Sequence, residues 1–167
     1  MDAPVNALLA PWTGEHGLPP FPQFRPSDFA PAYAKAMHEH REELAAIAAQ
    51  APAPDFANTI AAFDRAGQRL ADIDAVFDAL AASATSPELQ AVQRDLAAPL
   101  AAHWNAVYQD GRLFERVDAL HRQRAVLGLT GAQQRLLERL HLAFVRAGAQ
   151  LPPSQRERFA QIQERLA

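Results

Sequence analysis

Apolar residues three and four positions apart dominate this chain and restrict it to α-helix over most of its length. The longest run follows Asp55 and consists of Ile60, Phe63, Gly67, Leu70, Ile73, Phe77 and Leu80. Residues at these spacings share one face of an α-helix. The pattern predicts a continuous helix over residues 56–84, with Asp55 as its N-cap and Gly67 at a close approach of a neighbouring helix.

The same periodicity, with helix start and stop signals, predicts further helices along the chain. Strands would instead show an alternating pattern, and no segment has one. The predicted fold is therefore all-α, an antiparallel bundle of about six helices with an extended N-terminal arm. The other helices are expected at about 27–49, 86–109, 112–127, 130–146 and 153–167, with Ser27, Ser86 and Thr130 as N-caps and Gly148 as a C-terminal left-handed residue.

The two ends of the chain differ from this regular pattern. Residues 1–25 contain five prolines, which disfavour helix, but also Trp12, Phe21 and several leucines. We therefore predict an extended arm over 1–25 that packs on a helical domain over 26–167. The last predicted helix has no residue that would end it, so we expect the domain to be truncated from a longer protein.

Composition bears on the partners and the location of the protein. The net charge is −3 and Lys35 is the single lysine, so the chain lacks the basic stripe of a nucleic-acid-binding protein. It has no cysteine for disulfides or thiolate metal sites. No apolar run approaches the roughly 20 residues of a membrane span, and residues 1–6 do not resemble a secretory leader. We expect a cytoplasmic protein, or a periplasmic one if a leader was removed, with neither nucleic acid nor membrane as a partner.

The histidines are the candidate metal ligands. His38 and His40 are two residues apart, and consecutive helical residues are about 100° apart around the axis, so these side chains point to different faces. A zinc-binding pair on one helix needs a spacing of four residues. We interpret residues 38–40 as solvent-exposed surface.

A stronger candidate is a pair of carboxylate–histidine motifs, Asp118 with His121 and Glu138 with His141, on consecutive predicted helices. Such paired motifs hold di-iron centres in ferritin-like bundles. Glu138, however, lies about 130° from the apolar stripe of its helix, and Asp118 is similarly turned outward. Because these carboxylates should diverge, we expect no di-iron centre. The sequence also lacks a glycine-rich phosphate loop and a recognisable Ser-His-Asp or Cys-His arrangement, so we expect no catalytic and no metal-binding residue in this chain.

Several short stretches occur in a characteristic order and at characteristic spacing. They are residues 6–9 with 17–21, 25–29 with 31–33, the Phe-x-Asn-Thr-Ile segment at 56–60, and 144–151 leading to 162–167. Together they resemble the N-terminal region of the thimet oligopeptidase and peptidyl-dipeptidase (oligopeptidase A-like) family of zinc metallopeptidases. The resemblance covers nearly the whole chain.

The resemblance implies a role without catalysis. In the family's His-Glu-x-x-His motif the histidines bind zinc and the glutamate activates water, and this sequence has no such motif. The resemblance therefore implies zinc in a missing catalytic region, and a helical lobe here that helps to wall a channel admitting short peptides. The residues that would bind substrate are unknown.

The expected partners follow from that role. They are the missing catalytic lobe of the same protein and, in the full-length enzyme, short peptides. An apolar face that meets the missing lobe would be exposed in this piece, so we expect the piece to self-associate. The alternative is a free-standing helical protein-interaction module with no catalytic activity.

Overall fold

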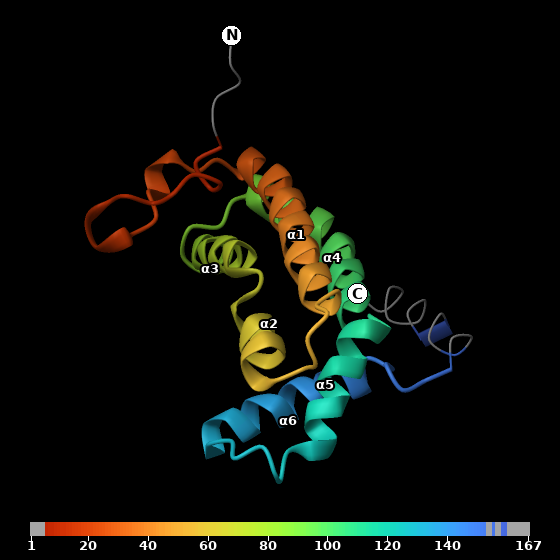
Figure 1. Ribbon diagram of the computed structural model, residues 1–167. Helices are drawn as coiled ribbons and strands as arrows, with labels where there is room; N and C mark the ends of the chain where they lie inside the picture. The colour runs from red at the N-terminus through yellow and green to blue at the C-terminus, as the bar shows by residue number, and fades with distance from the viewer. Residues whose placement is uncertain (1–5, 153–154, 156–157, 160–167) are drawn as a thin grey trace. The chain divides into compact units, whose positions relative to one another are not determined.

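A computed structural model describes residues 6–152, 155, 158 and 159 (Figure 1). Helices and turns make up this part of the chain, and no strand occurs among the described residues, which confirms the all-α fold class. None of the helices described combines the length and the apolar character needed to cross a bilayer. The antiparallel six-helix arrangement and the boundary at residue 25 stay predictions, and the predicted helix at 153–167 lies largely outside the described residues.

The helices follow one another with short connections, and the chain divides into two compact units. Unit 1 is Met1–His40 with Gly67–Ala97, and unit 2 is Arg41–Ala66 with Ala98–Ala167, so α1 and α4 each contribute to both. The elements are the 3₁₀ turns η1 (Glu15–Gly17) and η2 (Phe21–Gln23), then α1 (Pro26–Ala48), the π-helical η3 (Phe56–Ala61), α2 (Ala62–Arg65), α3 (Gln68–Ser83), α4 (Pro87–Tyr108), α5 (Gly111–Gln123) and α6 (Gly131–Arg146).

Three of the predicted N-caps are confirmed by their hydrogen bonds. The Asp55 carboxylate accepts from the backbone N–H of Asn58 at 2.6 Å. The Ser86 hydroxyl accepts from the backbone N–H of Leu89 at 3.2 Å. Thr130 and Gln133 form a reciprocal capping box at the start of α6. These contacts satisfy backbone donors that the first helical turn leaves without partners.

The start of α1 differs from the prediction by one residue. Ser27 is not the cap, because the helix already begins at Pro26, where the fixed φ of proline suits the first helical position. The Asp28 carboxylate instead accepts from the backbone N–H of Arg25 at 2.9 Å. The helix predicted at 112–127 is also shorter than expected, since α5 ends at Gln123 and a turn leads to Gly128.

The largest error concerns the predicted continuous helix over 56–84. The π-helical η3 and the short α2 together cover only residues 56–65. Ala66 and Gly67 then interrupt the helix, and α3 starts at Gln68. Gly67 has φ +75°, a left-handed conformation that favours glycine. A Cβ atom on Gly67 would lie 2.9 Å from His40 Cδ2, so the predicted close approach is confirmed, but it occurs at a break in the helix.

The same contact corrects the interpretation of residues 38–40 as solvent-exposed surface. His38 is exposed, as expected, but His40 is only 3% exposed. Its ring lies in the space that the missing side chain of Gly67 leaves open. His40 is therefore a buried residue of unit 1.

Aromatic side chains from α1 and α3 form the centre of unit 1. Phe29 and Tyr33 both pack edge-on against Phe77, with ring centroids 5.0 and 5.9 Å away. The Tyr33 hydroxyl donates to the Asp74 carboxylate. Burial, together with this bond, raises the pKa of Tyr33 far above its ordinary value of 10.0. Part of the predicted arm packs here too, since Leu8 is 2% exposed.

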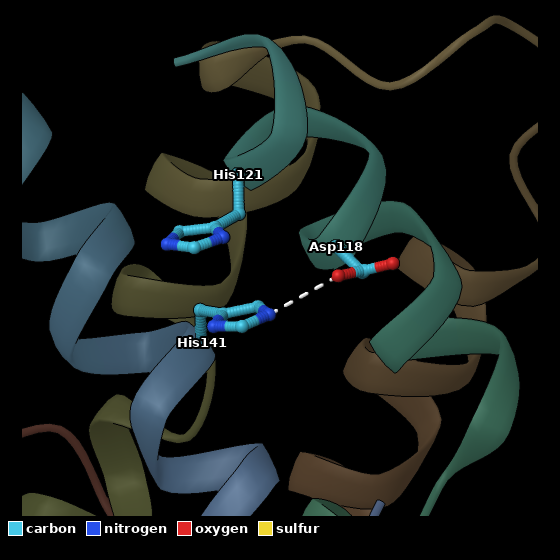
Figure 2. A group of neighbouring side chains, drawn as sticks. All are labelled: Asp118, His121 and His141. Atoms are coloured by element: carbon cyan, nitrogen blue, oxygen red, sulfur yellow. Dashed lines mark hydrogen bonds and ion pairs between the residues drawn. The ribbon is translucent and has the colours of Figure 1, made fainter. Parts of the chain in front are cut away.

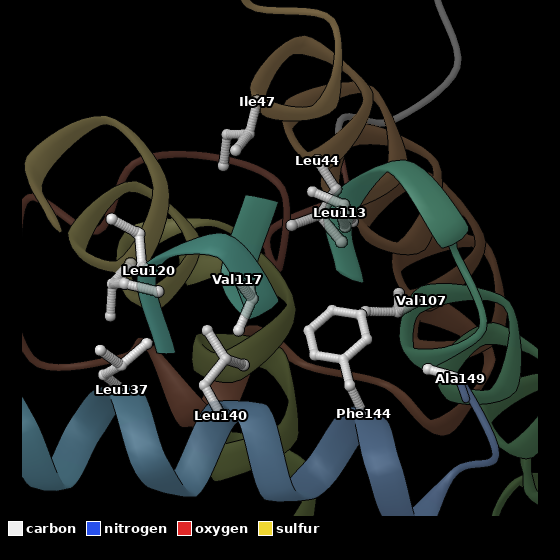
Figure 3. Close-up of a cluster of buried hydrophobic side chains, with 11 residues drawn as sticks. Leu44, Ile47, Val107, Leu113, Val117, Leu120, Leu137, Leu140, Phe144 and Ala149 are labelled. Atoms are coloured by element: carbon white, nitrogen blue, oxygen red, sulfur yellow. The ribbon is translucent and has the colours of Figure 1, made fainter. Parts of the chain in front are cut away.

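Aliphatic residues from several helices form the core of unit 2 (Figure 3). The apolar spacing of α5 predicts that Leu113, Val117 and Leu120 face inward, and each is at most 3% exposed. Burial of such side chains stabilises the fold by about 1.5–3 kcal/mol each. The cluster consists of Leu44, Ile47, Ile60, Val107, Leu113, Val117, Leu120, Leu137, Leu140, Phe144 and Ala149.

The break at Gly67 generates a first prediction. Replacing Gly67 by alanine should lower the free energy of unfolding by about 2–4 kcal/mol, because the left-handed φ costs about 1–2 kcal/mol and the new Cβ must displace the buried His40 ring. Urea unfolding followed by circular dichroism measures the loss. The matched control is Gly128→Ala, at φ +63° with nothing within 4 Å of the added Cβ, where only the backbone cost applies. Equal losses in the two variants would show that the His40 contact contributes nothing.

The buried phenol generates a second prediction. At alkaline pH the unfolded state loses the Tyr33 proton near pH 10 while the folded state keeps it, so stability is full below pH 10 and falls above it, by up to about 1.4 kcal/mol per pH unit. Tyr33→Phe should be less stable at pH 7, having lost the bond to Asp74. The difference in the free energy of unfolding between the wild type and Tyr33→Phe should narrow above pH 10. Denaturant unfolding at pH 7 to 11 checks this, and a gap that does not change with pH would contradict it.

Candidate functional site

Three potential metal ligands gather where α5 packs against α6 in unit 2 (Figure 2). Asp118 and His121 lie one turn apart on α5, and His141 reaches them from α6. One donor atom from each residue lies within 4.8 Å of the other two. Among the described residues, this is the one group of three or more His, Cys, Asp or Glu side chains with metal-ligand spacing.

Direct contacts hold the three side chains in place. The His141 Nε2 atom lies 3.1 Å from Asp118 Oδ1. The His121 and His141 rings stack face to face, with centroids 3.7 Å apart and planes 4° apart. The side chains of His141 and Asp118 are 13% and 15% exposed, so the cluster is largely shielded but still open to solvent.

The apolar packing of the two helices positions this cluster. Leu113, Val117 and Leu120 of α5 face the core, as do Leu137 and Leu140 of α6. On a helix, residues next to such a stripe lie along its flank. Packing the two stripes together therefore brings the flank of α5 that carries Asp118 and His121 beside the flank of α6 that carries His141.

Charged neighbours surround the cluster on both helices. Arg122 pairs with the second carboxylate oxygen of Asp118, and Arg124 lies 3.9 Å from Glu138. Burial lowers the pKa of His121; the charges of His141 and Arg124 add to this effect, while Asp118 and Glu138 oppose it. The lowered pKa favours the neutral form of the His121 ring, which has a lone pair on one nitrogen.

The structure corrects part of the argument against a metal site. Asp118 was expected to point outward but turns to His141. Glu138 does remain outside: its side chain is 45% exposed and accepts from Gln134 at 3.0 Å. Three of the four residues of the two carboxylate–histidine motifs thus come together, and the di-iron set is not completed. That this chain holds no metal and no catalytic residue stays a prediction.

A buried arginine on the same helix was missed by the sequence analysis. Arg116 is 9% exposed, and its guanidinium donates to the carbonyl oxygens of Gln50 and Pro52 at 3.1 and 3.2 Å. It also donates to Asn58 Oδ1 at 3.0 Å and to Thr59 Oγ1 at 3.3 Å. Arg116 lies three residues after Leu113 and four before Leu120, within the apolar stripe, and this position could have indicated that it is buried.

The Phe-x-Asn-Thr-Ile segment at 56–60 therefore has a structural role in unit 2. Asn58 completes a capping box with Asp55 and donates to the Ala53 carbonyl at 2.9 Å. Thr59 donates to Asn58 Oδ1 at 2.7 Å, and Ile60 is fully buried.

A shallow hollow of 260 Å³ also lies within unit 2, between η3, α2, α4 and α6. Its lining is mainly apolar, with Asp64 and Arg139 at its edge. Near it, Trp104 stacks on Tyr108 with ring centroids 6.0 Å apart and is 36% exposed. The other lining residues are Ile60, Phe63, Leu136, Leu140 and Ala143.

Comparison with known proteins identifies relatives of one kind. The chain is 40% identical over 147 residues to dipeptidyl carboxypeptidase of Escherichia coli, and 38% identical over 154 residues to that of Salmonella typhimurium. These matches cover 88% and 92% of the chain but only 22% and 23% of the relatives, so the chain spans less than a quarter of their length. No family model matches the chain. The two relatives confirm the resemblance to the peptidyl-dipeptidase family that the sequence motifs carried.

The Arg116 network generates a third prediction. Arg116→Met keeps most of the side-chain length but removes every donor, leaving the carbonyls of Gln50 and Pro52 without these partners. We expect a loss of about 2–4 kcal/mol in the free energy of unfolding. The matched control is Arg112→Met, which replaces an exposed arginine on the same helix and should change the free energy of unfolding by no more than about 0.5 kcal/mol. Thermal and urea unfolding of both variants measures the two losses. Similar values for both variants would assign the network no stabilising role.

Proposed function

We propose that this chain, which is homologous over most of its length to part of two dipeptidyl carboxypeptidases, is a non-catalytic helical lobe of a zinc-dependent peptidyl-dipeptidase. One observation carries the proposal: the chain matches less than a quarter of each relative at 38–40% identity and contains no His-Glu-x-x-His motif. The catalytic zinc would then be held by another part of the protein.

The residues of this chain do not fit the zinc site that the family implies. In that motif two histidines lie four residues apart on one helix, and a glutamate next to the first activates water. The cluster of Asp118, His121 and His141 draws its histidines from two helices and has no glutamate beside either of them. We therefore derive no hydrolytic step from this chain.

The proposed role of the lobe is to shape access to the catalytic zinc. Rigid helices beside a channel would admit short, unfolded peptides and exclude folded proteins. The name of the relatives favours release of dipeptides from a carboxyl end over internal cleavage. Helix faces of this chain that do not enter the cores of its units are available for such a wall.

A lobe of this kind needs a surface for the rest of the enzyme. The apolar hollow beside Tyr108 and the exposed side chains of Trp104 and Leu142, 36% and 45% exposed, supply apolar surface in unit 2. Without a partner, such surface favours self-association. These features support a contact with a further lobe and do not by themselves identify it.

A chimera tests the proposed function. In it, this chain replaces the matching 147 residues of the Escherichia coli relative. We expect the chimera to release dipeptides from short blocked peptides with kcat/KM within about tenfold of the parent, a difference of about 1.4 kcal/mol in transition-state stabilisation. The isolated chain should show no hydrolysis.

The controls separate the proposal from its alternative. The relative with those 147 residues deleted should be inactive. A folded but inactive chimera would favour the free-standing interaction module, and zinc-dependent hydrolysis by the isolated chain would contradict a non-catalytic lobe.

A further inference from the structure

The cluster on α5 and α6 has the composition of a metal site that the proposed function does not use. Asp118 and His121 lie on one helix and His141 on the next, so an ion bound here would join two separate elements (Figure 2). Around a tetrahedral zinc ion with bonds of about 2.0–2.2 Å, neighbouring donors lie about 3.3 Å apart. The donors here already lie within 4.8 Å of one another, so side-chain rotations without movement of the helices would bring them to these distances.

The donor chemistry of the cluster favours zinc among the common ions. Imidazole nitrogen and carboxylate oxygen are both zinc ligands, whereas calcium and magnesium require oxygen-rich sites. The Asp118 carboxylate pairs with Arg122 through one oxygen and contacts His141 through the other. Two imidazole nitrogens and one carboxylate oxygen would leave the fourth tetrahedral position for water.

Against the expectation from the sequence that this chain binds no metal, we propose that Asp118, His121 and His141 form a mononuclear zinc site that joins α5 to α6. The proposal stands apart from the proposed function, since it rests on the geometry of unit 2 alone. In the structure the imidazole planes are 4° from parallel, so their nitrogen lone pairs run side by side and do not converge. Zinc binding therefore turns at least one ring out of the stack and replaces the contact between His141 Nε2 and Asp118 Oδ1 with bonds to the ion.

The surroundings limit the site to three protein ligands. Glu138, one turn before His141, is exposed, bonded to Gln134 and beside Arg124. Arg122 neutralises one oxygen of Asp118 and leaves the other toward the histidines. Loss of one ligand of three should therefore be severe, while loss of Glu138 should have little effect.

Zinc titration of the full chain, purified without a histidine tag, tests the proposal. Calorimetry and metal analysis after dialysis should give one Zn²⁺ per chain, and the thermal midpoint should rise with zinc concentration, since zinc would bind the folded state. Asp118→Asn, His121→Gln and His141→Gln should each weaken binding at least tenfold. The matched controls Glu138→Gln and His38→Gln should keep the wild-type affinity within about twofold.

Two further readouts keep the test decisive. Ring nitrogen resonances in NMR should shift on zinc binding for His121 and His141, and not for the control histidine His38. If His141→Gln does not fold, as circular dichroism would show, the Asp118 and His121 variants decide. Absence of stoichiometric zinc, or binding that the folded ligand variants leave unchanged, would overturn the proposal, whatever the chimera shows.

Discussion

The guanidinium of Arg116 is the constraint on which the arrangement of unit 2 depends. The segment between α1 and η3 contains Pro52 and Pro54 and cannot satisfy its backbone carbonyls by continuing a helix. Arg116 donates to two of these carbonyls and to the side chains of Asn58 and Thr59. A rigid fork with five donors suits such a set of fixed acceptors. Because Arg116 lies on α5, the same bonds hold α5, and with it Asp118 and His121, against the turn that starts η3.

Helix existence and helix starts could be predicted from the sequence because they depend on local chemistry. Ser86 and Thr130 satisfy backbone donors of their own helices, and the apolar stripes of α5 and α6 are buried as their spacing predicts. The break at Gly67 could not be predicted in this way. The apolar spacing continues from Phe63 to Leu70 as if the helix were unbroken. At the break Gly67 takes a left-handed φ and lies against the ring of His40, a contact remote in sequence.

The candidate site shows the limit of an argument from helical phase. Phase places a residue relative to the apolar stripe of its own helix, and on that scale Asp118 is a flank residue turned from the core. Whether two flank residues on different helices meet depends on how the helices pack, and helical phase carries no information on that packing. The same reasoning placed Glu138 outside correctly, since its side chain is 45% exposed. The four residues of the two motifs could be identified from the sequence, but only the structure shows which three of them meet.

A metal bound by this subset would act on the fold before it acted on any substrate. Hydrolysis at zinc needs an open coordination position and also a base that takes the proton from water. Here the nearest acidic groups are Asp118, which is itself a donor, and Glu138, which is bonded to Gln134 and lies near Arg124. An ion held between α5 and α6 would instead oppose their separation, as a cross-link does. The proposed role of this lobe is to form a rigid wall of a peptide channel. The shape of that channel would then depend on the stiffness of α5 and α6.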